Sequence, residues 1–333
     1  MSSEESVVID PQAIKELELL DSRISDVDIE VTAKKHLMMA PIFAQRQQTI
    51  DKIPGFWAVV FENAAMELEG TITPTDSEVL VNALTKVEVL RPEIPAGAKP
   101  TDTGLDHFGE PRSITINFHF KENEWFSDRI LSKTLYFRYT KEGSAGLTSD
   151  PIRINWKAGK DLTEGLTEAA YQFWGAQKQT PSQQLDAVLT GNARKARDAA
   201  AKEMPQYKAL TKLLSESVNG SISFFNFFSY RGRWTSAAES QEARAEIKAR
   251  RAAALSGTDE EEMEDDDEDD EFDFAEEDVE TFPSGHDIAI SIAEDIWPDA
   301  IDYFFADSID SDVEIDDDDD DDEDDEDEDV EME

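Results

Sequence analysis

The sequence has no cysteine among its 333 residues, and this absence excludes several classes of site at once. Disulfide frameworks, thiolate zinc sites, iron–sulfur clusters and thiol nucleophiles all require that side chain. Histidine is scarce too: the four residues are scattered and form no His-x-x-x-His or His-Glu pair that would chelate a metal. We therefore expect neither cysteine chemistry nor a metal centre.

Long apolar runs and catalytic motifs are also missing. No stretch of about 18 apolar residues marks a membrane span, and the opening MSSEESVVID lacks the basic and apolar regions of a secretory signal. Neither a Gly-x-x-x-x-Gly-Lys-Ser/Thr phosphate loop nor a Gly-x-Ser-x-Gly nucleophile elbow occurs. The sequence predicts a soluble, intracellular protein that is not an enzyme and does not bind membranes.

Basic residues stop at Arg251, although acidic residues continue to the C-terminus. Residues 252–333 hold 42 of the 77 Asp and Glu and no Lys or Arg, whereas residues 1–251 carry 31 basic against 35 acidic side chains. The chain thus combines a nearly neutral body with an anionic C-terminal quarter. Such a chain repels phosphate backbones, so we expect cationic partners and only weak or indirect binding to DNA.

The acidic residues concentrate in two runs. Residues 259–280 contain 17 carboxylates, and residues 316–329 are 14 consecutive acidic residues. Charge repulsion and low apolar content predict that both runs are disordered, and the runs lack the ligand spacing of a calcium loop. A flexible polyanion can compete with DNA for the Lys and Arg side chains of a cationic protein. The alternative is an acidic segment that serves only solubility.

A heptad pattern near the N-terminus predicts one long helix over residues 10–57. Its apolar seam consists of Leu17, Leu20, Ile24, Val27, Val31 and Met38. A helix of about 60 Å cannot bury such a stripe alone, so it either pairs with a second copy or packs on its own domain; the length favours pairing. Pro41 lacks the N–H that a helix interior needs and predicts a bend or a local break.

The rest of the body predicts an α+β fold. Apolar and polar residues alternate over 86–89, 114–120, 135–139 and 152–156, which indicates four strands of an antiparallel sheet. Residues 163–215 are rich in Ala, Gln and Lys and predict helices, whose local excess of basic charge we interpret as an exposed helix face. Apolar clusters within 222–228 and 288–305 are expected to pack on the sheet.

Seven motifs in order resemble the nucleosome assembly protein family, most closely its SET/template-activating factor subgroup. They are the residues 41–57 from Pro-Ile-Phe-Ala-Gln-Arg to Ile-Pro-Gly-Phe-Trp, Leu84–Val89, Ile116–Asn123, Leu131–Lys133, Ile154–Leu162, Ser223–Phe228, and Glu294–Pro298 with Tyr303. Each motif is short. Their common order over about residues 11–305 is what makes the resemblance specific.

The resemblance implies a homodimer in which paired helices each carry an α+β "earmuff" domain. It divides the chain into a disordered N-terminus at 1–9, a dimerisation helix at 10–57 bent near residue 41, an earmuff domain at 58–305 with an acidic loop at 259–280, and a disordered acidic tail at 306–333. Two regions depart from the family pattern, because 163–215 is longer than usual and the acidic loop is an addition.

The function implied by the resemblance is that of an ATP-independent histone chaperone that promotes nucleosome assembly and has no cofactor. The residues expected to bind core histones are Asp265, Asp266, Asp267, Asp316, Asp317, Asp318, Asp319, Asp320, Asp321, Asp322, Glu323, Asp324 and Asp325. The cargo in turn implies a nuclear location, with shuttling to the cytoplasm left open. The alternative hypothesis is a regulatory protein that binds a histone acetyltransferase or a protein phosphatase.

Overall fold

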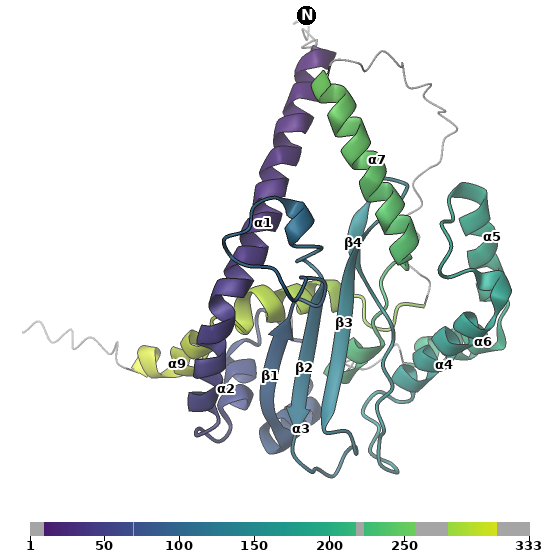
Figure 1. Ribbon diagram of the computed structural model, residues 1–333. Helices are drawn as coiled ribbons and strands as arrows, with labels where there is room; N and C mark the ends of the chain where they lie inside the picture. The colour runs from purple at the N-terminus through teal and green to yellow at the C-terminus, as the bar shows by residue number, and fades with distance from the viewer. Residues whose placement is uncertain (1–9, 69, 218–222, 257–278, 312–333) are drawn as a thin grey trace, which may run out of the picture.

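The computed structural model describes residues 10–68, 70–217, 223–256 and 279–311. Its first element, α1, is a single helix of 40 residues from Pro11 to Ile50. Asp10 caps the start of this helix, because its carboxylate accepts a hydrogen bond from the Gln12 N–H at 3.0 Å. In Figure 1, α1 runs along one side of the fold and extends well beyond the sheet.

The helix is continuous across Pro41, so the local break considered from the sequence does not occur. Beyond the proline, Phe43 packs against Trp297 with ring centroids 4.3 Å apart, and this contact helps hold the turn that lacks one hydrogen bond. The helix ends at Ile50, short of the expected residue 57. Pro54 disfavours helical geometry in the residue before it, and Gly55 turns the chain at φ 78° into α2, Phe56–Asn63.

Four antiparallel strands form one sheet in the order β1-β2-β3-β4. The strands are β1 (Leu84–Leu90), β2 (Ile114–Phe120), β3 (Ile130–Tyr139) and β4 (Ala145–Ser149). The first three coincide with predicted strands. One side of each strand is packed and the other is more exposed to solvent, which produces the alternating sequence pattern. The α+β class with a long N-terminal helix and an antiparallel sheet is therefore confirmed.

The fourth predicted strand, 152–156, was wrong, because β4 lies earlier in the chain. Residues 152–156 are extended and half-buried, which explains their alternating pattern, but they do not continue the sheet. The Ile152 N–H donates to the Phe228 carbonyl at 2.8 Å, and Trp156 forms only an isolated bridge with Phe126. Pro151 precedes this segment and lacks an N–H that a strand ladder would use.

The remaining helices surround the sheet unevenly (Figure 1). They are α3 (Pro74–Ala83), α4 (Leu166–Gln179), α5 (Gly191–Lys202), α6 (Pro205–Glu216), α7 (Ala237–Ser256), α8 (Gly285–Ile290) and α9 (Ala300–Ser311), with the short turns η1 (Leu105–His107), η2 (Pro181–Gln183), η3 (Phe224–Ser229) and η4 (Ser291–Ile296). Helices α4, α5 and α6 form a lobe beside the sheet, and α7 rises toward the N-terminal end of α1. None of the helices within the described ranges has the length and apolar character needed to cross a bilayer.

Aromatic side chains from η3 fill the core beneath the sheet. Phe118 of β2 lies 5.8 Å from Phe224 and 5.6 Å from Phe228, measured between ring centroids. The second apolar cluster also reaches the sheet, because the Trp297 indole N–H donates to the Val87 carbonyl at 3.0 Å. Both clusters therefore pack on the sheet as predicted. The last helix, α9, continues to Ser311, so the ordered domain is longer than the expected limit of 305.

Lys133 of β3 is completely buried, and its ammonium bonds to backbone carbonyls. Its ammonium donates to the carbonyls of Asp150 at 2.9 Å, Phe228 at 3.1 Å and Tyr230. Three acceptors match the three N–H donors of a protonated amine. Burial nevertheless lowers the pKa of Lys133 to about 7. This side chain ties the centre of β3 to the segments that follow β4 and η3.

Candidate functional site

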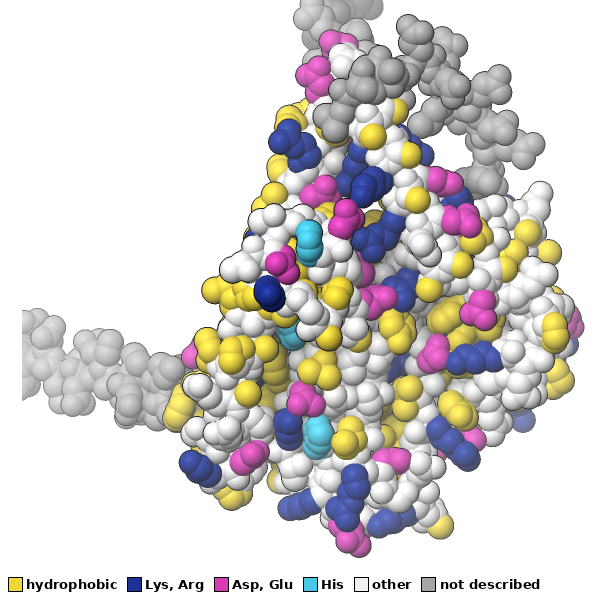
Figure 2. Space-filling view, viewed as in Figure 1, with side chains coloured by type: hydrophobic (Ala, Val, Ile, Leu, Met, Phe, Trp, Pro, Cys, Tyr) yellow, Lys and Arg dark blue, Asp and Glu magenta, His cyan; other side chains and the backbone are white. Residues whose placement is uncertain are grey.

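The predicted seam of α1 is exposed as an apolar stripe. Leu17, Leu20, Ile24, Val27, Val31 and Met38 all expose between 51% and 65% of their surface. Ile14 and Ile42, which the heptad analysis left out, extend the stripe at both ends. Figure 2 shows hydrophobic side chains along the outer edge of this helix. A continuous apolar strip of this length on a water-soluble surface indicates an interaction site.

The opposite face of α1 packs on its own domain. Ile29 and Ala33 are buried there, and they lie roughly 160° around the helix from the stripe at 100° per residue. The Glu30 carboxylate accepts a hydrogen bond from the Gly104 N–H at 2.9 Å, which fixes the loop between β1 and β2 against the helix. The domain therefore satisfies one face of α1 and leaves the stripe without a partner among the described residues.

The C-terminal end of α1 is clamped to the core by Arg46. Its guanidinium lies 4.4 Å from the Phe43 ring and 4.9 Å from the Trp297 ring, and it donates to the Pro298 carbonyl at 2.7 Å. Burial lowers the pKa of Arg46 to about 10. Because Trp297 is in turn bonded to β1, the direction of α1 relative to the sheet is fixed. A partner on the stripe would hold the domain at a defined angle.

A groove of about 890 Å³ lies between α1, α7 and β3. Its apolar lining includes Leu19, Ile29, Leu105, Phe137, Tyr139 and Ile247. Across the mouth, Arg251 of α7 pairs with Asp26 of α1 at 2.9 Å, and Lys248 approaches Asp106 at 3.4 Å. On the inner wall, Arg138 donates two hydrogen bonds to Glu93 at 2.8 and 3.1 Å. Opposite charges therefore face each other within this groove.

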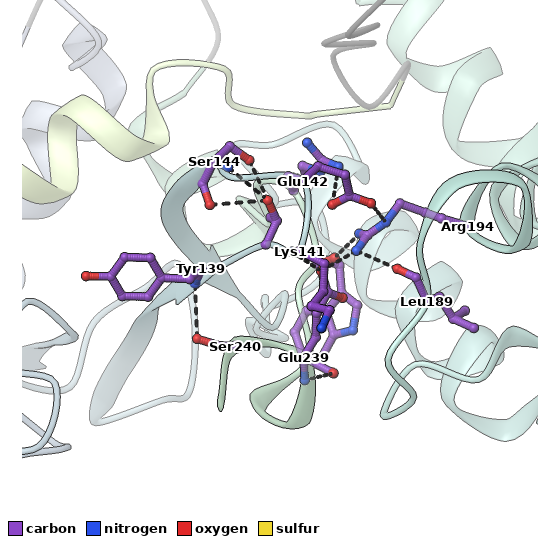
Figure 3. Close-up of polar contacts among 12 residues, drawn as sticks. Tyr139, Lys141, Glu142, Ser144, Leu189, Arg194, Glu239 and Ser240 are labelled. Atoms are coloured by element: carbon purple, nitrogen blue, oxygen red, sulfur yellow. Dashed lines mark hydrogen bonds and ion pairs between the residues drawn. The ribbon is translucent and has the colours of Figure 1, made fainter. Parts of the chain in front are cut away.

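Figure 3 shows the polar network that joins the α4–α6 lobe to the sheet and to α7. Arg194 of α5 donates to the Glu239 carboxylate and to the Leu189 carbonyl at 2.9 Å, and its Nε lies 3.3 Å from Glu142. The Ser240 hydroxyl accepts a hydrogen bond from the Tyr139 N–H at 3.0 Å. The basic charge of 163–215 was expected on an exposed helix face, but Arg194 of that segment is buried and serves the fold.

The carboxylates expected to bind histones, Asp265–Asp267 and Asp316–Asp325, lie outside the described residues. One acidic residue at the border of the first run was misplaced, because Glu280 belongs to the folded domain and not to an exposed loop. Its carboxylate accepts hydrogen bonds from the N–H groups of Arg231 at 3.1 Å, Gly232 at 3.0 Å and Phe282 at 3.1 Å. Thr281 beside it is buried.

The described part of the chain contains no candidate metal centre. In that part, no group of three or more His, Asp or Glu side chains has a geometry that could hold a metal ion. His119 of β2 approaches Glu88 at 3.6 Å, which makes it a residue of the sheet surface. The features that stand out in the described residues are therefore the stripe and the groove.

Comparisons with known proteins agree on one family. A profile described as nucleosome assembly protein (NAP) matches residues 23–307. "NAP1-related protein 1" of Arabidopsis thaliana is 30% identical over 152 residues, which cover 45% of this chain and 51% of that protein. "Protein SET" of Drosophila melanogaster is 28% identical over 161 residues, which cover 47% of this chain and 52% of that protein. The matched part of this chain thus spans about half the length of these relatives.

Among solved structures, the fold is similar to the crystal structure of Ccp1, with a TM-score of 0.46 and 24% identity over 89% of this chain and 95% of that one. The family match rests on the profile, which extends from the middle of the apolar stripe on α1 to α9. It includes every motif on which the resemblance was based. The chain therefore belongs to the nucleosome assembly protein family.

Proposed function

We propose that this protein is an ATP-independent histone chaperone that acts as a homodimer in the nucleus. The observation that carries the proposal is that one chain combines a NAP-family domain with a segment, 252–333, that holds 42 acidic and no basic residues. Core histones are cationic and precipitate on DNA when they are unshielded. A polyanion tethered to a folded platform can occupy their basic surfaces until DNA, a denser line of charge, displaces it.

The apolar stripe on α1 is the proposed dimer interface, and the charges of the helix select its orientation. Residues 11–30 contain six acidic and two basic side chains, whereas residues 31–50 contain three basic side chains and no acidic one. A parallel pair would place the two acidic halves side by side. An antiparallel pair places acidic halves against basic halves and sets Ile24 of one copy near Val31 of the other.

Dimerisation leaves the other surfaces free. The groove beside α7 and the stripe lie on opposite faces of α1, so a partner helix on the stripe does not enter the groove. The clamp at Arg46 would hold the two domains at fixed angles to the helix pair. Each dimer would then present two copies of each acidic run to one cargo. Once one run is bound, the others are held close to the same cargo, which raises their effective concentration there.

The test is direct binding of purified core histones to the full chain, followed by transfer of the histones to DNA. We expect tight binding at low ionic strength, less precipitation of histone–DNA mixtures, and nucleosomes that form without ATP. A disordered Asp/Glu peptide of matched length and charge is the control. Equal activity of that peptide would show that the folded dimer contributes nothing and would refute the proposal.

A further inference from the structure

The groove beside α7 lies along the N-terminal half of α1. Its wall on α1 covers residues 19–29, and its wall on α7 covers residues 237–252. Figure 1 shows α7 rising along this half of α1 toward the start of the helix. Leu19 lies about 14 Å from Asp10 at 1.5 Å per residue, so residues 1–9 join the described fold close to one end of the groove.

The floor of the groove combines apolar surface with charges that are already paired. Phe137 and Tyr139 of β3 contribute aromatic rings to it. The Arg112 guanidinium lies 3.8 Å from the Phe137 ring and donates two hydrogen bonds of 2.8 Å to the Glu110 carboxylate. The pair of Arg138 with its carboxylate partner on the inner wall is described above. The floor therefore offers an occupant apolar surface and little uncompensated charge.

The mouth of the groove carries arginines that its own carboxylates do not fully match. Arg23 makes no ion pair with any other residue in the part of the chain that the structure describes. Arg244 lies 3.9 Å from Glu110, whose carboxylate Arg112 already holds. Figure 2 shows Lys and Arg side chains where α7 approaches α1. A fitting occupant would thus carry carboxylates together with apolar side chains.

Residues 1–9 have this composition. Glu4 and Glu5 supply two carboxylates, and the segment contains no Lys or Arg. Val7, Val8 and Ile9 follow as a continuous apolar group. Because the segment is attached to the N-terminal end of α1, its effective concentration at the groove is high. The chain thus supplies its own candidate occupant.

The lengths of the segment and of the groove also agree. An extended chain that runs back along α1 places Val7 about 10 Å and Glu4 about 20 Å from Asp10, at about 3.3 Å per residue. On the helix, Leu19 and Arg23 lie about 14 Å and 20 Å from the same point. Helix side chains lean toward the N-terminus, which brings Leu19 still closer to Val7. Apolar groups would then meet apolar groups, and carboxylates would meet Arg23.

A second copy of the chain is a poorer source of this segment. In the antiparallel pair proposed above, Ile24 of one copy lies near Val31 of the other, so residue 10 of the other copy lies opposite residue 45. That point is at least about 24 Å along α1 from the groove at 1.5 Å per residue. The stripe and the groove also lie on opposite faces of α1. The segment of the same chain is therefore the occupant that the geometry favours.

We propose that residues 1–9 dock in the groove of their own chain, with Val7 against Leu19 and with Glu4 and Glu5 facing Arg23. The docked segment ties the outer half of α7 to α1, where the exposed pair of Lys248 and Asp106 contributes little. Another protein that uses the groove has to displace this segment first. The inference does not rest on the proposed function, because it requires neither histones nor a dimer.

The absence of cysteine allows a direct test in the full chain. Ser3→Cys is combined with Ala252→Cys, which lies in the groove wall, or with Arg250→Cys, which is exposed roughly 160° around α7 from it. We expect the first pair to form a disulfide about tenfold faster than the second in a glutathione buffer. Equal rates would mean that residues 1–9 do not dock in the groove, and would overturn the inference in favour of the disordered N-terminus expected from the sequence.

Charge reversal tests the contact with Arg23. In the Ser3→Cys/Ala252→Cys chain, Arg23→Glu should slow disulfide formation about fivefold, and high salt should slow it in the unreversed chain. Arg250→Glu reverses another exposed arginine that lies outside the groove and should have no effect. Adding Glu4→Lys and Glu5→Lys to Arg23→Glu should restore the rate. A rate that is equally slow with and without these two lysines would contradict the proposed pairing.

Two further measurements separate the possible occupants. Chains with Ser3→Cys alone are mixed with chains that carry Ala252→Cys alone; disulfides between two chains as fast as those within one chain would make a second copy the occupant and overturn the inference. Deleting residues 2–9 should raise amide hydrogen exchange in residues 244–253 of α7. Unchanged exchange there would show that the segment does not hold α7 against α1.

Discussion

Replacing Leu17, Ile24 and Val31 with Asp should convert the protein from a dimer to a monomer. Each of the six seam side chains exposes slightly more than half its surface in the single chain. Burying that half contributes about 1 kcal/mol per side chain, so twelve side chains in a dimer supply about 12 kcal/mol. Association itself costs about 4–15 kcal/mol in lost freedom, so the margin for a stable dimer is small.

The triple variant removes half of the apolar contribution, about 6 kcal/mol, and so weakens dimerisation by about four orders of magnitude. It also places six carboxylates in the seam. In the antiparallel arrangement the new aspartate at position 24 of one copy faces that at position 31 of the other, which adds repulsion. Light scattering at micromolar concentration should report 37.4 kDa, the mass of a single chain.

A matched control adds the same three charges to exposed positions off the stripe, as Gln12→Asp, Ala40→Asp and Gln48→Asp. This control should remain dimeric. Circular dichroism checks that both variants keep the folded domain, since its core lies away from the stripe. A triple seam variant that keeps its fold and elutes as a dimer would refute the assignment of the interface to this stripe.

Three further predictions concern buried ions and the acidic run. Lys133→Met should flatten the rise in the free energy of unfolding between pH 7 and 10.5, because the unfolded chain keeps the lysine proton in that window and the folded chain loses it; parallel pH profiles in urea unfolding would contradict this. Arg194→Met should destabilise the fold by about 3–5 kcal/mol, because Glu239 then stays buried without its cation, and adding Glu239→Gln should restore part of the loss in the same assay. Deleting residues 312–333 leaves α9 whole and should weaken histone binding more at low salt than at high salt; an equal loss at both would remove charge from the mechanism.

The parts of the fold that the sequence predicted are those with a regular period. The seven-residue repeat on α1 and the two-residue alternation of the first three strands each reflect one packed and one open face. At Pro41 contacts with distant residues override the local preference for a helix break. The proline lacks an N–H in any context, yet the Phe43 and Arg46 contacts with distant Trp297 keep the helix intact.

The wrong predictions concern residues whose contacts are made with segments distant in the sequence. Residues 152–156 alternate like a strand, because they lie between the core and solvent. Their hydrogen bonds go to η3 from Ile152 and to the connection between β2 and β3 from Asn155, and not to a strand of the sheet. The basic charge of 163–215 and the acidic run 259–280 were expected to face solvent, yet Arg194 and Glu280 from these segments are held by partners more than 40 residues away in the chain.

The separation of charge from the folded body would let one chain both dimerise and act as a polyanion. If the 42 carboxylates of residues 252–333 were spread over the domain, self-repulsion would oppose folding and oppose the close approach of two α1 helices. Gathering most of them in runs leaves residues 1–251 almost neutral, so the apolar stripe can pair while the anionic runs stay available. Salt should then distinguish two kinds of contact with the proposed histone cargo. Screening would weaken contacts made by the acidic runs, whereas contacts made by apolar side chains of the folded domain would persist. Binding that survives high salt would therefore come from the folded surfaces of the dimer and not from its net charge.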